Sequence, residues 1–159
     1  MTMKTFIHFL AIFALSTTMF AKGSPGPPNA TKVFLKNSKQ GGLKFNGAGV
    51  MHSARFGLLL VAESGGSLVA IDTGHTGPFK PVKPFADFGA KVAGAVGTTA
   101  DKITINDLKA NPETGTLYVS VRRSDGLSTV LTLDHSGQLA ALDTTKLNWV
   151  RIKLSEKLR

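Results

Sequence analysis

A β-type unit occurs twice in this chain, and this repeat constrains the fold more than any other feature. The first copy, residues 57–72, reads GLLLVAESGGSLVAID, and the second, residues 115–134, reads GTLYVSVRRSDGLSTVLTLD. Each copy opens on glycine, alternates as a strand does, turns at a glycine-containing segment and ends its second apolar run on aspartate. Such units recur where one unit cannot bury its own apolar face. The repeat therefore predicts an array of antiparallel β units.

Matching positions in the two copies predict a shared packing role. Leu59 and Val61 in the first copy correspond to Leu117 and Val119 in the second. A strand places alternate side chains on the same face. We therefore expect the two hairpins to form equivalent sheets in adjacent units, with these four residues on a shared buried face.

Each copy also ends on an aspartate that precedes a turn. These residues are Asp72 and Asp134, and they occupy equivalent positions in the repeat. Aspartate before a turn commonly accepts hydrogen bonds from the backbone N–H groups of that turn. A structural role is therefore expected for both carboxylates.

The rest of the folded region predicts strands and loops, and no helix. We expect strands over 31–35, 50–52, 103–108, 138–142 and 144–154, with a loop over 37–49. Two prolines within 79–88 limit that segment to an edge or connecting strand. The run 91–100 is rich in small residues and glycine, which disfavours a helix.

The N-terminal residues have the pattern of a secretory signal peptide. Lys4 provides the positive charge, residues 6–20 form an apolar stretch, and Ala21 offers a small residue before a cleavage site. An uncleaved anchor is the less favoured alternative, because a membrane span needs about 20 apolar residues. We expect export to the periplasm or the exterior. The predicted organisation is a signal peptide (1–21), a Pro/Gly-rich linker (22–31) and an all-β domain (32–159).

The charge and the absence of cysteine limit the classes of partner and site. The chain has 19 Lys and Arg against 10 Asp and Glu, a net charge of +9, and no cysteine. A basic chain favours anionic partners such as a membrane or cell-wall surface. The basic residues are scattered, with the Arg122-Arg123 pair expected in a turn, and this argues against a nucleic-acid interface. Without cysteine, the chain has no disulfide framework and no thiolate zinc site.

Two stretches of the sequence resemble the repeats of β-propellers. Residues 105–108 (INDL) and 111–120 (NPETGTLYVS) resemble the blade signature of six-bladed propellers of the NHL-repeat and gluconolactonase (senescence-marker) types. Residues 139–149 (LAALDTTKLNW) are similar to a quinoprotein-type repeat, although Lys146 stands where that repeat has glycine. The resemblance implies a β-propeller-like array of antiparallel sheets.

The chain is too short for a complete ring of this kind. Closed propellers usually have about 4–8 blades of four strands, and the repeat spacing here provides about two. We therefore predict an incomplete propeller, truncated from a longer one, with assembly of copies or an open sandwich as alternatives. Residues 153–159 show no strand that could pair back with the first one. Open strand edges on such an array predict self-association.

The resemblance to gluconolactonase-like propellers also implies a metal site. Those proteins gather carboxylates and asparagine amides around a central divalent cation, so Asn106, Asp107 and Glu63 are the candidate ligands here. Calcium suits such oxygen ligands. The interpretation that we favour is structural: Asn106 and Asp107 cap a turn between strands, and Glu63 is a solvated strand end. His75 and His135 are expected to lie exposed in turns that follow strands.

Two functions follow from these observations. The one we favour is a non-enzymatic exported module for binding or scaffolding, with a protein or an anionic surface ligand as its partner. The alternative is the N-terminal part of a metal-dependent lactonase- or dehydrogenase-like enzyme whose catalytic residues lie beyond Arg159. The sequence has no Gly-x-Ser-x-Gly elbow and no dinucleotide-binding glycine pattern. Enzymatic activity of this chain alone is therefore open, and it is not our first expectation.

Overall fold

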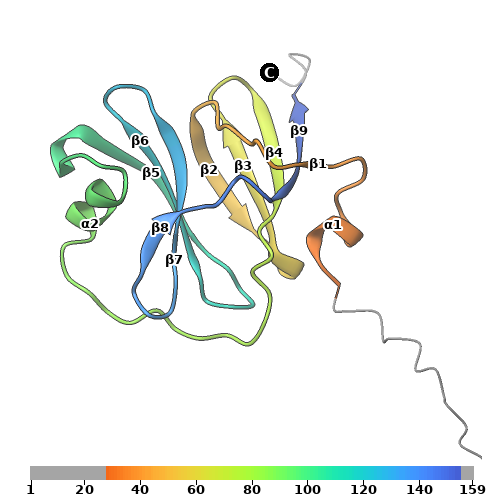
Figure 1. Ribbon diagram of the computed structural model, residues 1–159, viewed down its shortest axis with the longest axis horizontal. Coiled ribbons are helices and arrows are strands. Elements are labelled where there is room, and N and C mark those ends of the chain that lie inside the picture. Colours follow the sequence, from red (N-terminus) through yellow and green to blue (C-terminus); the bar gives the residue numbers. More distant parts are fainter. Residues whose placement is uncertain (1–27, 155–159) are drawn as a thin grey trace, which may run out of the picture.

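The computed structural model describes residues 28–154, and these residues are mostly β-strand, as the sequence predicts. The strands are β1 (Lys39–Gln40), β2 (Ala48–Ser53), β3 (Leu58–Glu63), β4 (Ser67–Asp72), β5 (Ile103–Ala110), β6 (Leu117–Arg123), β7 (Ser128–Leu133), β8 (Leu139–Ala141) and β9 (Asn148–Lys153). They form two antiparallel sheets that lie side by side (Figure 1). The first sheet has the order β1-β9-β4-β3-β2 and the second β5-β6-β7-β8. The predicted signal peptide lies outside the described residues.

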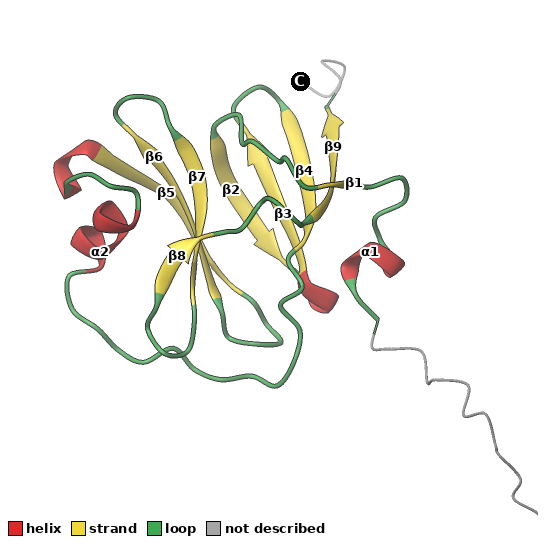
Figure 2. Ribbon diagram, viewed as in Figure 1, coloured by secondary structure: helices red, strands yellow, loops and turns green. Residues whose placement is uncertain are grey.

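Short helices flank the two sheets on opposite sides (Figure 2). They are α1 (Ala30–Val33) and α2 (Phe88–Ala95), with one-turn 3-10 helices η1 (Arg55–Gly57) and η2 (Ala100–Lys102) before β3 and β5. The prediction of a strand over 31–35 is wrong, because the Asn29 side chain accepts a hydrogen bond from the Lys32 N–H and caps a helix there (3.0 Å). None of the helices within residues 28–154 is long and apolar enough to cross a bilayer.

Helix α2 also corrects the expectation that the small-residue run is not helical. Val92 and Ala93 are fully buried, and Val92 packs against Val119, Val121 and Leu131 of the second sheet. Packing of one apolar face outweighs the low helix propensity of the glycines in this segment, as tertiary contacts often do. Helix α1 includes Ala30 and Thr31, which the sequence assigned to the linker.

The two repeat units form equivalent hairpins, as predicted. In the β3–β4 hairpin Leu59 pairs with Ile71, and in the β6–β7 hairpin Leu117 pairs with Leu133. These are the positions that match between the two copies of the repeat. The same register recurs, so the repeat in sequence is a repeat in structure.

The backbone conformation at the start of each hairpin explains why a glycine stands there. Gly57 has φ of 73° and Gly115 has φ of 79°, a region that other residues rarely adopt. At Gly115 a side chain would also collide with the backbone, since a Cβ there would lie 2.3 Å from the Lys80 carbonyl oxygen. Both hairpins therefore begin where glycine is required.

The aspartates that end the two hairpins have the predicted structural role. The Asp72 Oδ1 atom accepts a hydrogen bond from the Gly74 N–H at 3.0 Å, and the Asp134 Oδ1 atom accepts one from the Ser136 N–H at 2.9 Å. The Ser136 hydroxyl donates to the same carboxylate and lowers the pKa of Asp134. Asp72 also accepts a bond from the Thr31 N–H, which ties α1 to the first sheet.

The two sheets pack against each other around a common core. Leu59 and Val61 of the first sheet are fully buried there against Tyr118 and Val130 of the second. Val119 does not lie in this core. It packs with α2 on the far face of the second sheet, so the predicted single buried face for the matched residues is wrong.

The matched residues nevertheless point the same way in both sheets. The Leu59 face of the first sheet is covered by the second sheet, whereas the equivalent Val119 face is covered by α2. The opposite face of the first sheet, around Leu58 and Ala70, is covered by α1. Equivalent faces of the two sheets therefore point in the same direction along the stack. A helix covers each outer face of the stack, where a further sheet would lie in a longer array.

The C-terminal strand returns to the first sheet. Strand β9 pairs with β4, with Ser67 opposite Lys153, and it also pairs with β1, with Lys39 opposite Trp149. Strand β9 ends at Lys153, so this first residue of the segment 153–159 does pair back. Residues 155–159 lie outside the described part of the chain, and the prediction for them is not tested. The partners of β9 are far away in the sequence, so no local pattern identified them.

Candidate functional site at the junction of the two sheets

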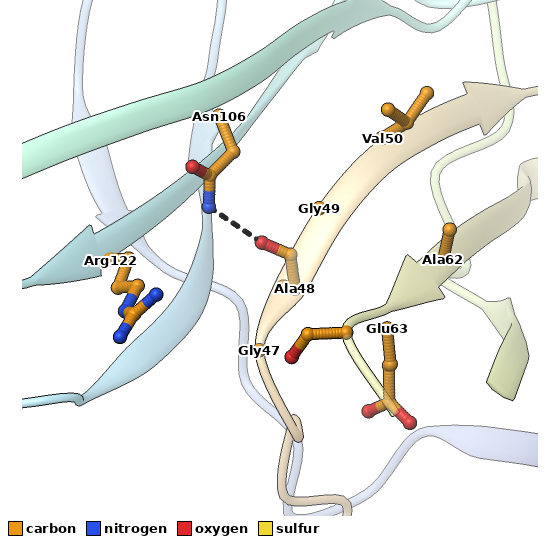
Figure 3. Close-up of a pocket in the computed structure, with 9 residues that line it drawn as sticks. Gly47, Ala48, Gly49, Val50, Ala62, Glu63, Asn106 and Arg122 are labelled. Carbon is orange, nitrogen blue, oxygen red and sulfur yellow. Dashed lines mark hydrogen bonds between the residues drawn. The ribbon is translucent and has the colours of Figure 1, made fainter. Parts of the chain in front are cut away.

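A cleft opens where β2 meets the second sheet (Figure 3). It has a volume of about 350 Å³. The residues that line it are Gly47, Ala48, Gly49, Val50, Ala62, Glu63, Ser64, Asn106 and Arg122. The edge strands β2 and β5 both carry a bulge at this level, between Ala48 and Met51 and between Ile105 and Asp107. A bulge interrupts pairing and redirects side chains, which leaves room for the cleft.

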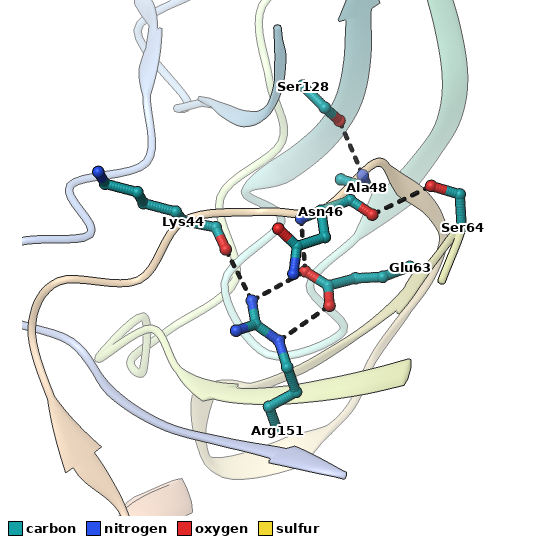
Figure 4. A network of polar contacts seen from close by, with 7 residues as sticks. All are labelled: Lys44, Asn46, Ala48, Glu63, Ser64, Ser128 and Arg151. Atoms are coloured by element: carbon teal, nitrogen blue, oxygen red, sulfur yellow. Dashed lines mark hydrogen bonds and ion pairs between the residues drawn. The ribbon is translucent and has the colours of Figure 1, made fainter. Parts of the chain in front are cut away.

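Side chains of the second sheet bind the free edge of β2. Asn106 donates to the Ala48 carbonyl oxygen (2.8 Å) and Ser120 donates to that of Gly49 (2.8 Å). On the N–H side, Asp107 accepts from Met51 (2.7 Å). Ser128 accepts from Ala48 (2.7 Å; Figure 4). Among the described residues, no neighbouring strand pairs with this edge of β2. Polar side chains of the second sheet therefore supply the hydrogen bonds that its backbone N–H and C=O groups need.

The structure brings only two of the three candidate metal ligands to the cleft. Asn106 and Glu63 line it, whereas Asp107 points to the Met51 N–H and forms an ion pair with Lys109 (3.5 Å). Within residues 28–154 no group of three or more His, Asp or Glu side chains gathers. A calcium site at Asn106, Asp107 and Glu63 stays a prediction, and each of these side chains already has protein partners.

Glu63 is buried and paired, so the expectation of a solvated strand end is wrong. The expectation that Asn106 and Asp107 cap a turn is also wrong, because both lie inside β5. The Glu63 side chain is fully buried and accepts two hydrogen bonds from Arg151 of β9, at 2.9 and 3.0 Å (Figure 4). It also accepts a bond from the Asn46 N–H (2.8 Å), and Arg151 donates to the Lys44 carbonyl oxygen. This pair joins the end of β3 to β9 and to the loop before β2.

Replacing Asp107 separates its structural role from a metal role. Asp107→Ala leaves the Met51 N–H without its acceptor, at a cost of about 1–3 kcal/mol. Asp107→Asn keeps an acceptor oxygen and should retain most of that stability in metal-free buffer. Adding calcium should change the Tm of the parent by little or nothing. A rise of several degrees that Asp107→Ala abolishes would overturn the structural interpretation.

Arg122 is the cation of the cleft. It lies near the end of β6 on the same side as Tyr118 and Ser120, facing the first sheet, and not in a turn as predicted (Figure 3). Its guanidinium is exposed and makes no hydrogen bond or ion pair within residues 28–154. Arg122 also lines a second hollow, together with Lys102, Arg123 and Asp101. Arginine presents several donors in a planar fork that suits carboxylate and phosphate groups.

A second polar cluster lies inside the junction, and the sequence did not predict it. The Tyr118 hydroxyl is fully buried, 3.0 Å from Thr73 Oγ1 and 2.9 Å from His75 Nδ1. Asn111, also fully buried, donates to the His75 carbonyl oxygen at 2.9 Å. The rings of His75 and Tyr118 are stacked 5.7 Å apart. His75 is therefore half-buried rather than exposed, whereas His135 is exposed as expected.

The cluster predicts a pH dependence of stability. Burial lowers the pKa of His75 below its ordinary value of 6.5, so the unfolded chain takes up a proton at higher pH than the folded one. Stability should therefore be full above the unfolded pKa and fall as the pH drops towards the folded value. We expect a lower Tm at about pH 5 than at about pH 7.5.

The matched variants are His75→Gln and His135→Gln. His75→Gln should reduce the pH dependence, and His135→Gln, which changes an exposed histidine, should leave it unchanged. Equal pH profiles for all three proteins would contradict the role assigned to His75.

The sequence did not predict the cluster around Tyr118, because its contacts with Thr73 and His75 join distant parts of the chain. The single local hint is Ser120, a polar residue between Tyr118 and Arg122 on the face of β6 that packs against the first sheet. No protein-family model, curated protein or solved structure matches the chain.

Proposed function

We propose that this protein is an exported, non-enzymatic binding module of the propeller type, which holds an anionic ligand in the cleft between its two sheets. The observation that carries the proposal is Arg122, an exposed cation at the cleft with no partner among residues 28–154. Its neighbour Asn106 has a second amide N–H, beside the one that it donates to the Ala48 carbonyl oxygen, and this group can add a hydrogen bond to an anion.

The charge balance supports an anionic ligand over a cationic one. Most carboxylates near the junction are already engaged: Glu63 pairs with Arg151, Asp107 with Lys109, and Glu113 with Arg55. The net charge of +9 would also raise the local concentration of anions.

The architecture supports a propeller-type arrangement. Four strands of the five-stranded first sheet, β2-β3-β4-β9, stack with the same sense as the four-stranded second sheet, β5-β6-β7-β8. Strand β9 completes this first set of four, and the two-residue strand β1 lies at its outer edge. Radially repeated sheets of this kind commonly present binding surfaces at the edges where units meet. The cleft lies at such a junction.

The side chains at the junction support binding rather than catalysis. Asn106, Asp107, Ser120 and Ser128 each make a hydrogen bond to the backbone of β2. These polar groups hold the two sheets together, whereas Arg122 has no such partner within residues 28–154 and is free to bind a ligand.

Export rests on the sequence pattern of residues 1–21, and N-terminal sequencing of exported protein should find a start near Lys22. Recovery of Met1 would contradict it.

Anion binding is tested with inorganic phosphate, citrate and a soluble polyphosphate chain as probes, measured by calorimetry. Arg122→Gln should weaken binding about tenfold, the size expected for loss of a charge-assisted hydrogen bond. Arg55→Gln is the matched control, since it removes the same charge from an exposed arginine that pairs with Glu113. Polyphosphate binding far more tightly than phosphate would point to an anionic surface polymer.

Two results would contradict the proposed site. Equal losses in Arg122→Gln and Arg55→Gln would mean that only the overall charge matters. No binding of any probe to the parent protein would remove the proposal altogether.

A further inference from the structure

The first sheet has an open strand edge. Strand β1 pairs with only two residues of β9, Asn148 and Trp149. Within the described part of the chain, no strand lies beyond the rest of that edge, Val150 to Lys153.

The direction of the free backbone groups of β9 follows from the hydrogen bonds between β9 and the chain at β4. The Leu154 N–H donates to the Gly66 carbonyl oxygen at 2.9 Å. Bonded and non-bonded pairs alternate along an antiparallel ladder, so Ile152 exchanges its bonds with β4. The N–H and C=O groups of Arg151 and Lys153 then point to the open side, where an added strand would lie.

The recess beside this edge is basic. It has a volume of about 430 Å³ and is lined by Asn37, Lys39, Ser67, Trp149, Val150, Arg151 and Lys153, with no carboxylate among them. Lys39 and Arg151 both lie over the Trp149 ring, 5.4 and 5.2 Å from its centre. Arg151 is already paired with Glu63, whereas Lys39 and Lys153 have no ion-pair partner within residues 28–154.

From this geometry we infer that the open edge of β9 binds an extended acidic segment of a partner protein, which continues the line of β1. Main-chain bonds to Arg151 and Lys153 would supply affinity, and acidic side chains would meet Lys39 and Lys153. This is the strand-addition mode of peptide recognition. It uses a surface separate from the Arg122 cleft.

The positive charge at the open edge of β9 favours an acidic segment over a second copy of this chain. Lysine on an edge strand discourages pairing with another copy of the same chain, because like charges would come to lie opposite each other. An acidic segment reverses the sign of that interaction. No run of carboxylates occurs in the sequence, so the segment is assigned to a partner chain.

The test uses two labelled synthetic peptides of equal length and charge, an alternating Glu-Val peptide and an alternating Glu-Pro peptide. Proline cannot donate to a ladder, so the second peptide carries the charge without the pairing. Fluorescence anisotropy should show binding of Glu-Val, at least about tenfold weaker binding of Glu-Pro, and a salt-dependent affinity. Amide hydrogen exchange should slow at Arg151 and Lys153 when Glu-Val binds.

Variants then locate the edge. Lys153→Pro removes an outward N–H while the bonds of Ile152 and Leu154 to β4 remain, and it should abolish the preference for Glu-Val over Glu-Pro. Lys153→Gln should weaken both peptides and keep the preference. Arg122→Gln should leave peptide affinity unchanged, which separates this surface from the anion cleft.

Several results would overturn the inference. These are equal binding of the two peptides, exchange protection at another edge such as β5 or β8, and self-association of the protein with no peptide binding. If Lys153→Pro does not fold, the peptide pair and the exchange pattern on the parent protein decide the question by themselves.

Discussion

The Arg151→Met variant is expected to lose about 3–5 kcal/mol of stability, the typical cost of breaking a buried ion pair by removing one partner. Glu63 has a fully buried side chain, and Arg151 supplies two of its hydrogen bonds. Without the guanidinium, the carboxylate keeps only the Asn46 N–H as a partner. Chemical denaturation followed by circular dichroism measures the loss.

The matched control for this prediction is Lys109→Met. It removes the same charge from an ion pair with Asp107 in which the lysine side chain is 42% exposed. Exposed pairs contribute at most about 1 kcal/mol. A loss from Arg151→Met no larger than that from Lys109→Met would contradict the role given to the Glu63–Arg151 pair in joining β3 to β9.

Asn111→Ala is expected to cost about 3 kcal/mol, because it removes a fully buried side chain and leaves three partly buried backbone groups without partners. The Asn111 side chain accepts bonds from the Glu113 and Thr114 N–H groups (2.8 and 3.2 Å) and donates to the His75 carbonyl oxygen. It thereby shapes the turn before β6 and links it to the turn after β4.

Asn106→Ala is the comparison for Asn111→Ala. Asn106 is exposed and makes a single bond, to the Ala48 carbonyl oxygen, so its loss should cost about 1 kcal/mol. Similar costs for the two asparagines would show that the buried cluster around Tyr118 adds little to the junction.

The repeat, the hairpins and most strands could be predicted from the sequence because their patterns are local. Alternation, the glycines at 57 and 115 and the aspartates at 72 and 134 all act within one hairpin. Helix α2 could not be predicted in the same way, since its formation depends on burial of Val92 against a sheet that is made later in the chain.

The site could be predicted less well than the fold. The sequence indicates Asn106 and Asp107 as candidate metal ligands. It does not indicate that both form hydrogen bonds to β2, more than fifty residues earlier in the chain. The Glu63–Arg151 pair and the His75–Tyr118 contact are equally non-local. Side-chain chemistry alone does not specify such partners, because loop closure and packing decide which segments meet.

Strand β9 completes the first of two stacked sheets, and a single cross-link tests this arrangement most directly. Ser67 and Lys153 lie opposite each other on β4 and β9 in a non-bonded pair, where Cα atoms are about 4.5 Å apart. The chain has no cysteine, so a Ser67→Cys/Lys153→Cys protein carries only the introduced pair. Oxidation should close an intramolecular disulfide with the fold intact. In the control, Ser67→Cys is combined with Ala140→Cys on β8 of the other sheet, and it should remain reduced. Failure of the first pair to close, or equal closure of the control, would contradict the account.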